Sequence, residues 1–521
     1  MTQQEYDAVI VGAGHNGLVT ATWLARSGLR VLLLEARSEV GGMAGWHEIH
    51  PGFQAPSLAH LVPGLNARTI RALDLDGAGL EKDLQRVSTI SLRDDGDDLH
   101  IDPDPAAAAH AIGAHSAADG AAWRDFHARM QRHVEALRPL IENTPPRLDF
   151  SERGNLMQLA RLGWSVRRQG RASMRELLRI ISMNMADLID ENFEADAVRG
   201  MLALDSVLGT DHGPRSPNTV FSWLLRQTLF NGAPMLSAGG SQRLVKALEV
   251  AARNAGVDIR TDARVARIDV AGGSARGVEL ADGTRYQADA VVANTDPVTT
   301  LVDLVDADHL DADFLGDVRA FRNRATTGKV NLALDRAPDL PLPEGGGAAR
   351  WVIAPSLDAV EQAFDQVKYR EDVNAPALEI TVPSFTDTGL APDGQHVMSV
   401  NVAYVPYRED AAQDLGERVV RQIEAHAPGF AESVVACEAW GPADIEARFG
   451  ARGGHWHHGD IALDQYFLTR PVPGFNQYRT PVDGLYLCGA GTHPGGGVTG
   501  ISGSNAAREI LQDRKSRRKV A

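Results

Sequence analysis

The start of the chain combines two apolar runs with one helical pattern. Residues 8–11 and 31–34 are continuous apolar stretches, as in strands that a parallel sheet buries on both faces. Between them, apolar residues recur at helical spacing as far as Ala25, and Gly28 stands where a helix would end. The pattern predicts a strand–helix–strand unit, the building block of an α/β fold with a parallel sheet.

Later segments repeat both patterns. Alternating or short apolar runs predict strands within residues 89–101, 257–259, 263–270, 277–280, 288–293, 329–334, 378–383 and 397–404. Helical spacing predicts helices at residues 106–141, 156–207, 242–254 and 411–427. The helical stretches before residue 207 are rich in bulky apolar side chains, which predicts a helical core. The pattern leaves open whether some of them also line a cavity for an apolar substrate.

A glycine-rich turn, Gly12-Ala13-Gly14-His15-Asn16-Gly17, follows the first predicted strand directly. In dinucleotide-binding folds, such glycines allow a tight turn, backbone approach to a pyrophosphate, and close packing of helix on strand. Glu35 ends the second strand, where an acid would bind a ribose hydroxyl. The complete unit predicts dinucleotide binding, and the alternative is a glycine-rich turn in an ordinary βαβ unit.

The residues after Glu35 indicate which dinucleotide binds. Arg37 and the pair Gly41-Gly42 extend the motif as RxxxGG. This extension resembles that of FAD-binding flavoproteins of the glutathione-reductase and amine-oxidase type. The resemblance implies that Ala36, Arg37, Gly41, Gly42 and Met43 lie against the FAD diphosphate and its sugars.

A second glycine cluster stands near the end of the chain. Residues 483–498 read as a strand that runs into a glycine loop, with a helix after it. Flavoproteins of the same type close the FAD site with such a segment. A helix start there can stabilise negative charge on the reduced flavin. The residues expected to contact the flavin are Gly489, Gly491, Thr492, Gly496, Gly497 and Val498.

The resemblance extends over nearly the whole chain. Residues 12–28, 470–475 and 484–498 resemble those of the phytoene-dehydrogenase-like flavoproteins, which include carotenoid desaturases, carotenoid isomerases and retinol saturases. The closest likeness is to a branch labelled pyridine nucleotide-disulfide oxidoreductase domain proteins. Cys437 and Cys488 form no CxxC or CxxxxC pair, so disulfide redox chemistry is not expected.

The resemblance implies a Rossmann-like FAD-binding domain interleaved with an α+β substrate domain. The predicted FAD-binding domain comprises residues 1–75, 236–297 and 478–513, and Val265 would offer its backbone to the adenine. The predicted substrate domain comprises residues 76–235 and 298–477, including the helical stretches. Residues 514–521 form a basic tail, which we expect to be a solvated, disordered end; the alternative is an anchor to anionic lipids.

Composition excludes several classes of function. The 521 residues carry a formal charge of −16, which argues against nucleic acid as a partner. Two cysteines suit a reducing compartment, and no apolar run approaches the roughly twenty residues that span a bilayer. We expect a cytoplasmic protein and leave open a peripheral contact with a membrane.

Five histidines are candidates for chemistry. His15 lies within the glycine turn and is interpreted as a turn residue beside the cofactor. His455 and His457 would share one face of a strand, but no further ligand stands at local spacing, so we expect no metal. The resemblance places His458 near the flavin and the substrate. His493 lies within the flavin loop, where it could contact the ring or the substrate or could equally fix the loop. We name His458 and His493 as catalytic candidates.

The sequence thus predicts an FAD-dependent oxidoreductase that moves a hydride between flavin N5 and an apolar small molecule. Desaturation, saturation and isomerisation of a carbon–carbon bond all remain open. So do the substrate, the electron acceptor (oxygen or a quinone) and the oligomeric state. Two alternatives are a flavin amine oxidase, for which the loop lacks the expected aromatics, and a flavin-binding interaction protein with little turnover.

Overall fold

The computed structural model describes residues 5–520, apart from residues 63, 81–83, 147–162, 165–166, 169 and 238. The first sheet has the strand order β10-β11-β12-β1-β2-β9, with β18 paired to β12. Its core is parallel, because β1 runs parallel to both β12 and β2. Its strands are β1 (Glu5–Val11), β2 (Val31–Leu34), β9 (Asp258–Arg260), β10 (Val265–Ala271), β11 (Ser274–Leu280), β12 (Arg285–Ala293) and β18 (Leu485–Leu487).

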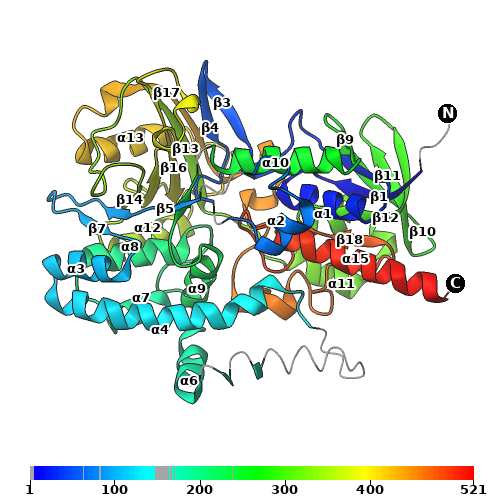
Figure 1. Cartoon of the computed structure of the whole chain (residues 1–521), viewed down its shortest axis with the longest axis horizontal. Coiled ribbons are helices and arrows are strands. Elements are labelled where there is room, and N and C mark those ends of the chain that lie inside the picture. Colours follow the sequence, from blue (N-terminus) through cyan, green and yellow to red (C-terminus); the bar gives the residue numbers. More distant parts are fainter. Residues whose placement is uncertain are drawn as a thin grey trace.

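Both faces of this sheet are buried, as the continuous apolar runs predict. Ala8 and Ile10 pack with α1 (His15–Arg26), α10 (Gly240–Asn254) and α15 (Ile501–Val520). Val9 and Val11 face the other way and pack toward α11 (Ala312–Arg319). Segments from the start, the middle and the end of the chain therefore build one layered unit, which occupies the right half of Figure 1.

The second sheet has the order β17-β13-β16-β15-β14-β6-β7 and is antiparallel except for the pair β14–β6. Its apolar core includes α13 (Leu415–His426). Strands β14 and β17 had no counterpart in the sequence prediction. The strands are β6 (Thr89–Ser91), β7 (Leu99–Ile101), β13 (Thr327–Leu334), β14 (Arg350–Ile353), β15 (Leu378–Thr381), β16 (His396–Ala403) and β17 (Val434–Trp440).

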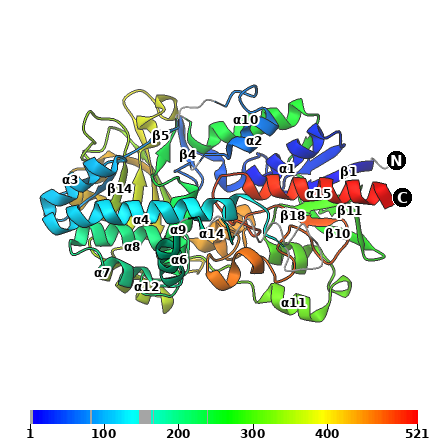
Figure 2. The same cartoon turned by 60° about the horizontal axis from the view of Figure 1, so that its bottom comes forward.

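Helices cover one side of the second sheet, and α4 runs along the outside of this block (Figures 1 and 2). The predicted helix 106–141 is two helices, because Ser116 caps α4 by accepting a hydrogen bond from the amide of Asp119. The predicted helix 156–207 lies partly outside the described residues. The described helices of the block are α3 (Pro105–His115), α4 (Ala117–Glu142), α6 (Gly170–Ile180), α7 (Met185–Asp190), α8 (Asp196–Val207), α9 (Thr219–Leu229) and α12 (Leu357–Lys368).

Smaller elements connect these parts. They are β3 (Trp46–His50), β4 (Phe53–Pro56), β5 (Gln85–Arg86), β8 (Met235–Leu236), α2 (Ala67–Leu73) and α14 (Pro442–Phe449). Within the part of the chain that the structure describes, no helix combines the length and the apolar character needed to span a membrane.

The prediction of a disordered basic tail was wrong. Helix α15 continues through these residues to Val520. Arg514 forms an ion pair with Asp7 at 2.6 Å, and Arg517 forms one with Asp483 at 3.3 Å. Two of the basic residues are thus paired with acidic groups beside the first sheet, which the local sequence does not reveal.

Candidate functional site

A cavity of about 320 Å³ is lined by residues of both sheets and of the loops between them. The structure brings most of the predicted site residues to its wall, although they come from opposite ends of the chain. Those residues are Gly12, Gly14, His15, Asn16, Glu35, Ala36, Arg37, Gly41, Gly42, Met43, Val265, His458, Gly496, Gly497 and Val498. Their contacts with FAD remain a prediction.

The other predicted residues, Gly17, Gly489, Gly491, Thr492 and His493, do not line the cavity. A Cβ atom on Gly17 would lie 2.1 Å from the carbonyl oxygen of Gly12, so this glycine lets α1 pack against the turn. A Cβ atom on Gly491 would lie 2.2 Å from Pro297. These two glycines therefore allow the segments that form the cavity wall to pack closely against their neighbours.

The turn after β1 has the space and the donors that a pyrophosphate needs. Gly12 has a φ of +95°, which favours glycine, and Gly14 begins α1 without a side-chain cap. The first amide groups of α1 therefore have no capping side chain, as at helix starts that bind phosphate. A Cβ atom on Gly14 would lie 2.8 Å from the Asn294 side-chain nitrogen. The turn at residues 12–17, called the glycine cradle below, thus has no room for a side chain at Gly14.

Glu35 is held at the edge of this cradle. Its carboxylate accepts hydrogen bonds from the amides of Ala13, at 2.8 Å, and Arg37, at 3.0 Å. The Arg37 guanidinium lies over the Phe449 ring, 4.8 Å from its centroid. Turn, acid and glycine loop together fit an FAD, whose pyrophosphate and ribose require these groups.

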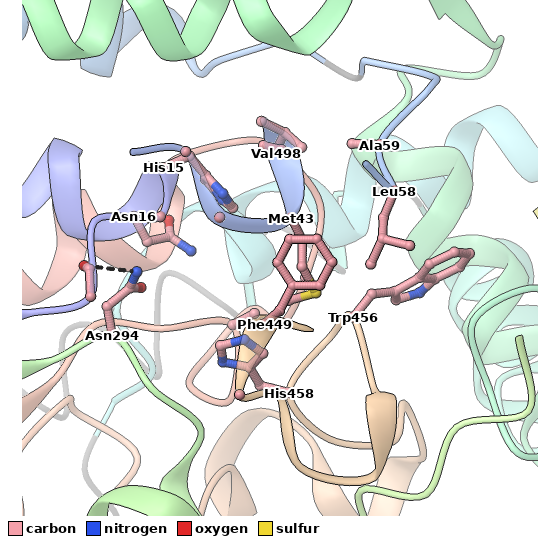
Figure 3. A pocket seen from close by; sticks show the side chains of 18 of the residues that line it. His15, Asn16, Met43, Leu58, Ala59, Asn294, Phe449, Trp456, His458 and Val498 are labelled. Carbon is pink, nitrogen blue, oxygen red and sulfur yellow. Dashed lines mark hydrogen bonds between the residues drawn. The ribbon is translucent and has the colours of Figure 1, made fainter. Parts of the chain in front are cut away.

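His15 and His458 line the cavity and are neutral near pH 7. Burial lowers the pKa of His15 to about 4, and burial also lowers the pKa of His458. His15 Nε2 and His458 Nδ1 are buried and have no hydrogen-bond partner among the described residues. Such unpartnered nitrogens suit contact with a ligand. Figure 3 shows His15 and His458 on opposite sides of the cavity.

His493 occupies a different environment. Its Nε2 donates to the carbonyl oxygen of Leu140 at 2.9 Å, near the end of α4. Its ring packs against Tyr466 and Phe467. Burial lowers its pKa to about 3. This geometry favours a role in joining the glycine loop to α4 over contact with reacting atoms.

Residues 455–458 do not form the strand that the sequence suggested. They follow a short 3-10 turn at Arg452–Gly454, and the amide of His457 donates to His455 Nδ1 at 3.2 Å. Throughout the described residues, no group of three histidine, cysteine or acidic side chains is arranged to hold a metal.

Away from the glycine turn, the cavity wall becomes apolar. Figure 3 shows Leu58, Ala59 and Trp456 at the end opposite Asn16 and Asn294, with Met43 and Phe449 between them. Sequence reasoning missed this wall because its residues come from separate loops and helices and form no local motif. The further apolar residues of the wall are Leu61, Leu208 and Phe230.

A charged cluster forms part of the same end. His60, Arg226, Glu379 and Asn401 line the cavity, and Lys329, Arg350 and Asp205 adjoin them. Sequence reasoning missed this cluster as well. The alternation of polar and apolar residues in 329–334 and 397–404 was a usable signal, because it marks a polar face on each strand.

A smaller cavity of about 90 Å³ lies within the helical block. Trp123, Phe126 and Met130 of α4 line it, together with Asp205 and Arg350. Some of the bulky helical residues therefore do border an open space, and the charged cluster lies between this space and the main cavity. Leu156, Leu159 and Leu162, which the same reasoning considered, lie outside the described residues.

Comparison with known proteins agrees with this geometry. The family model described as flavin containing amine oxidoreductase matches residues 17–511. The chain is 32% identical to mouse pyridine nucleotide-disulfide oxidoreductase domain-containing protein 2, over 98% of this chain and 94% of that protein. It is 28% identical to hydroxyneurosporene desaturase of Cereibacter sphaeroides, over 98% of each chain. It is 26% identical to carotenoid 3,4-desaturase of Haloarcula japonica, over 97% and 98%.

Solved structures share the fold. An oxidoreductase from Methanosarcina mazei superimposes with a TM-score of 0.62 at 18% identity, covering 98% of this chain and 100% of that one. The α/β FAD-binding fold expected from the sequence is confirmed. The chain therefore belongs to the family of flavin-containing amine oxidoreductases and is an FAD-dependent oxidoreductase.

Proposed function

We propose that this enzyme oxidises, reduces or isomerises a carbon–carbon bond of an apolar small molecule. The observation that carries the proposal is the continuity of the cavity from the glycine cradle into a wall of Leu58, Leu61, Leu208, Phe230 and Trp456. Burial of an apolar substrate against such a wall is favourable and needs few polar contacts. Bound FAD supplies the hydride acceptor or donor for such a reaction.

We propose that the cradle residues hold the cofactor. Gly12 and Gly14 would face the pyrophosphate, Glu35 the ribose, and Val265 the adenine. Gly496, Gly497 and Val498 would lie at the flavin, since they line the same cavity as His458. Gly17, Gly489, Gly491 and Thr492 would act indirectly, by shaping the backbone of the cradle and loop.

His458 is the proposed catalytic residue. It lines the cavity, and its unpartnered Nδ1 can donate or accept a proton because the neutral ring exists in either tautomer. Desolvation keeps this ring neutral, so one ring nitrogen has a lone pair available, while the same desolvation makes the ring a weaker base. His493 would position the loop that carries Gly496 and Gly497.

The charges in the cavity oppose the amine oxidase alternative. A protonated amine needs an open carboxylate or an exposed aromatic face. The Arg226 guanidinium lies over Phe230, 5.2 Å from the ring centroid, and Arg37 lies over Phe449. Cations therefore already lie over two of the cavity's aromatic rings and would repel an ammonium group there, which leaves Trp456 as the ring open to an amine.

Anaerobic bleaching of the bound flavin tests the proposal. Alkenes, alcohols and amines that share one carbon skeleton would be added to the FAD-loaded protein, and the visible absorbance followed. We expect bleaching by a compound whose apolar carbon–carbon bond reacts, or reoxidation of reduced flavin by its alkene. Bleaching by amines alone would support the amine oxidase alternative. If no compound changes the flavin absorbance and none is recovered as an isomer, the result would support the alternative of a flavin-binding interaction protein with little turnover.

We further propose a cytoplasmic protein whose helical block touches a membrane, from which an apolar substrate would enter. Trp164 and Leu178 beside and within α6 are exposed, at 62% and 66%. Exposed arginines adjoin them, at positions 167, 168, 171, 175 and 179, in a chain of charge −16. Such a mixture suits an anionic lipid surface. Co-sedimentation with anionic vesicles, and its loss in Trp164→Ser with Leu178→Ser, tests the contact.

A further inference from the structure

The second sheet buries a polar face. In β13, β15 and β16, Val330, Ile380 and Val400 pack into the apolar core with α13. The alternate residues Lys329, Glu379 and Asn401 are charged or polar, yet they are at most 5% exposed. The polar face of an antiparallel sheet usually meets water. Here it meets the cavity. Buried charges are costly unless they are paired, and clusters of them are often found at functional sites.

Glu379 lies at the centre of this face, and both of its carboxylate oxygens contact neighbouring polar side chains. One carboxylate oxygen accepts from Arg226 and from Arg350 Nε, the latter at 2.8 Å. The other accepts from Asn401 Nδ2 at 2.9 Å and lies 3.0 Å from His60 Nε2. A carboxylate offers about four acceptor positions: three accept from Arg226, Arg350 and Asn401, and the His60 ring covers the fourth. Glu379 therefore has no position left for a donor on a ligand.

Arg226 has the most exposed side chain among the charged members of the cluster that the ion pairs describe. Its side chain is 19% exposed, whereas those of Glu379 and Arg350 are 1% and 2% exposed. It makes one hydrogen bond to a described residue, the bond to Glu379. A guanidinium carries five N–H donors, so donors remain for a ligand. A ligand group at this position must accept hydrogen bonds.

The cluster is close to electrically neutral. The guanidinium groups of Arg226 and Arg350 face the carboxylates of Glu379 and Asp205. Burial lowers the pKa of His60 to about 4, so this ring is neutral at pH 7. Burial lowers the pKa of Lys329 to about 7, and this amine lies behind Asn401, to which it donates at 3.0 Å. A further buried charge on the ligand would be poorly compensated.

We propose that this end of the cavity binds an uncharged oxygen group, a hydroxyl or a carbonyl, at one end of an otherwise apolar substrate. The oxygen accepts a hydrogen bond from Arg226, while the chain lies along Leu58, Leu61 and Leu208. The inference rests on the proposed function for the apolar body of the substrate. It adds that the substrate is amphipathic and that its oxygen is recognised away from the glycine cradle.

Binding of saturated probes tests this inference without any turnover. Octane, 1-octanol, 2-octanone, octanoate and octylammonium would be titrated calorimetrically into FAD-loaded wild type, Arg226→Met and Arg226→Lys. Arg215→Met is the matched control, because Arg215 is an exposed arginine of the same block that pairs with Asp358. Comparing one ligand between two proteins cancels the cost of removing that ligand from water.

In Arg226→Met, affinity for 1-octanol and 2-octanone should fall about tenfold or more, the usual effect of losing a hydrogen bond to a charged group. Octane should change less than about twofold. Arg226→Lys should restore part of the affinity, and Arg215→Met should match wild type. Equal losses for octane and octanol would overturn the inference, because Arg226 would then only shape the cavity.

If Arg226→Met fails to fold, Arg226→Lys takes its place: a loss for 1-octanol and 2-octanone that octane does not share supports the inference, and equal losses overturn it. The wild-type series then tests only whether the bound group is uncharged. Tighter binding of octanol and octanone than of octanoate and octylammonium supports the uncharged group. Preference for octanoate or for octylammonium overturns it. Failure of the bleaching experiment would leave this ranking unchanged, so the two proposals fail separately.

Discussion

The side-chain nitrogen of Asn294 donates to the carbonyl oxygen of Gly12 at 3.2 Å, which ties the end of β12 to the turn after β1. Gly14 lies beside this bond, and any Cβ atom there would meet the Asn294 amide. We therefore expect Gly14→Val to abolish FAD retention, because its methyl groups would occupy the cradle. The measurement is flavin released per denatured protein. Gly316→Val is the control, since no atom lies within 4 Å of its Cβ position. Release of NAD or FMN from wild type would refute the cofactor assignment.

The C-terminal helix should be needed for the same site. Gly503 of α15 lies against α1, where a Cβ atom would be 2.3 Å from the carbonyl oxygen of Asn16. Gly503→Ala should push the two helices apart and weaken FAD binding, whereas Gly316→Ala should not. Removal of residues 481–521, with β18 and α15, should prevent FAD retention altogether. A truncated protein that still binds stoichiometric FAD would contradict this.

His458→Ala should lower turnover of an identified substrate while FAD content stays constant. Loss of a positioned proton donor or acceptor costs on the order of a hundredfold in rate. His309→Ala, at an exposed histidine, is the control. Steady-state kinetics and flavin content decide between outcomes: loss of FAD would assign His458 to the cofactor site, and unaltered turnover would remove it from catalysis.

His493→Ala should act on stability. The substitution removes the hydrogen bond to the partly buried carbonyl of Leu140, and the loss of such a bond costs about 0.5–1.5 kcal/mol. Thermal unfolding should therefore occur at a lower temperature, while kcat per folded, FAD-loaded molecule stays near the wild-type value. Reduced kcat with unchanged thermal unfolding would instead return His493 to the reacting centre.

Lys329 should make stability depend on pH. Burial lowers its pKa from 10.5 to about 7, so between these values the unfolded chain binds more protons than the folded one. The free energy of unfolding therefore rises with pH across that window, and below about pH 7 the full penalty remains. Lys329→Met should remove about 2 kcal/mol of this rise between about pH 7 and pH 9. Urea unfolding of both proteins at the two pH values measures it. An equal change in the free energy of unfolding between the two pH values in both proteins would show that Lys329 is not buried as a titrating amine.

The sequence alone determined the cofactor half of the protein. Strand, glycine turn, helix and acid lie within residues 5–42, and the periodicity of each element is visible locally. The continuous apolar runs correctly indicated a sheet buried on both faces. Short-range spacing sufficed here because the cradle is formed largely by backbone, and glycines report directly where backbone must be bare.

The charged cluster at the apolar end of the cavity could be found only from the tertiary structure. His60 and Glu379 are 319 positions apart, and Arg226 and Glu379 are 153 apart, yet each pair forms one contact. Arg226 reaches Glu379 from α9, whereas His60 reaches it from the loop after β4. The role of His493 likewise depends on the distant carbonyl of Leu140. A side chain's charge, partners and exposure are set by the segments that pack around it, and those contacts have no signature in local spacing.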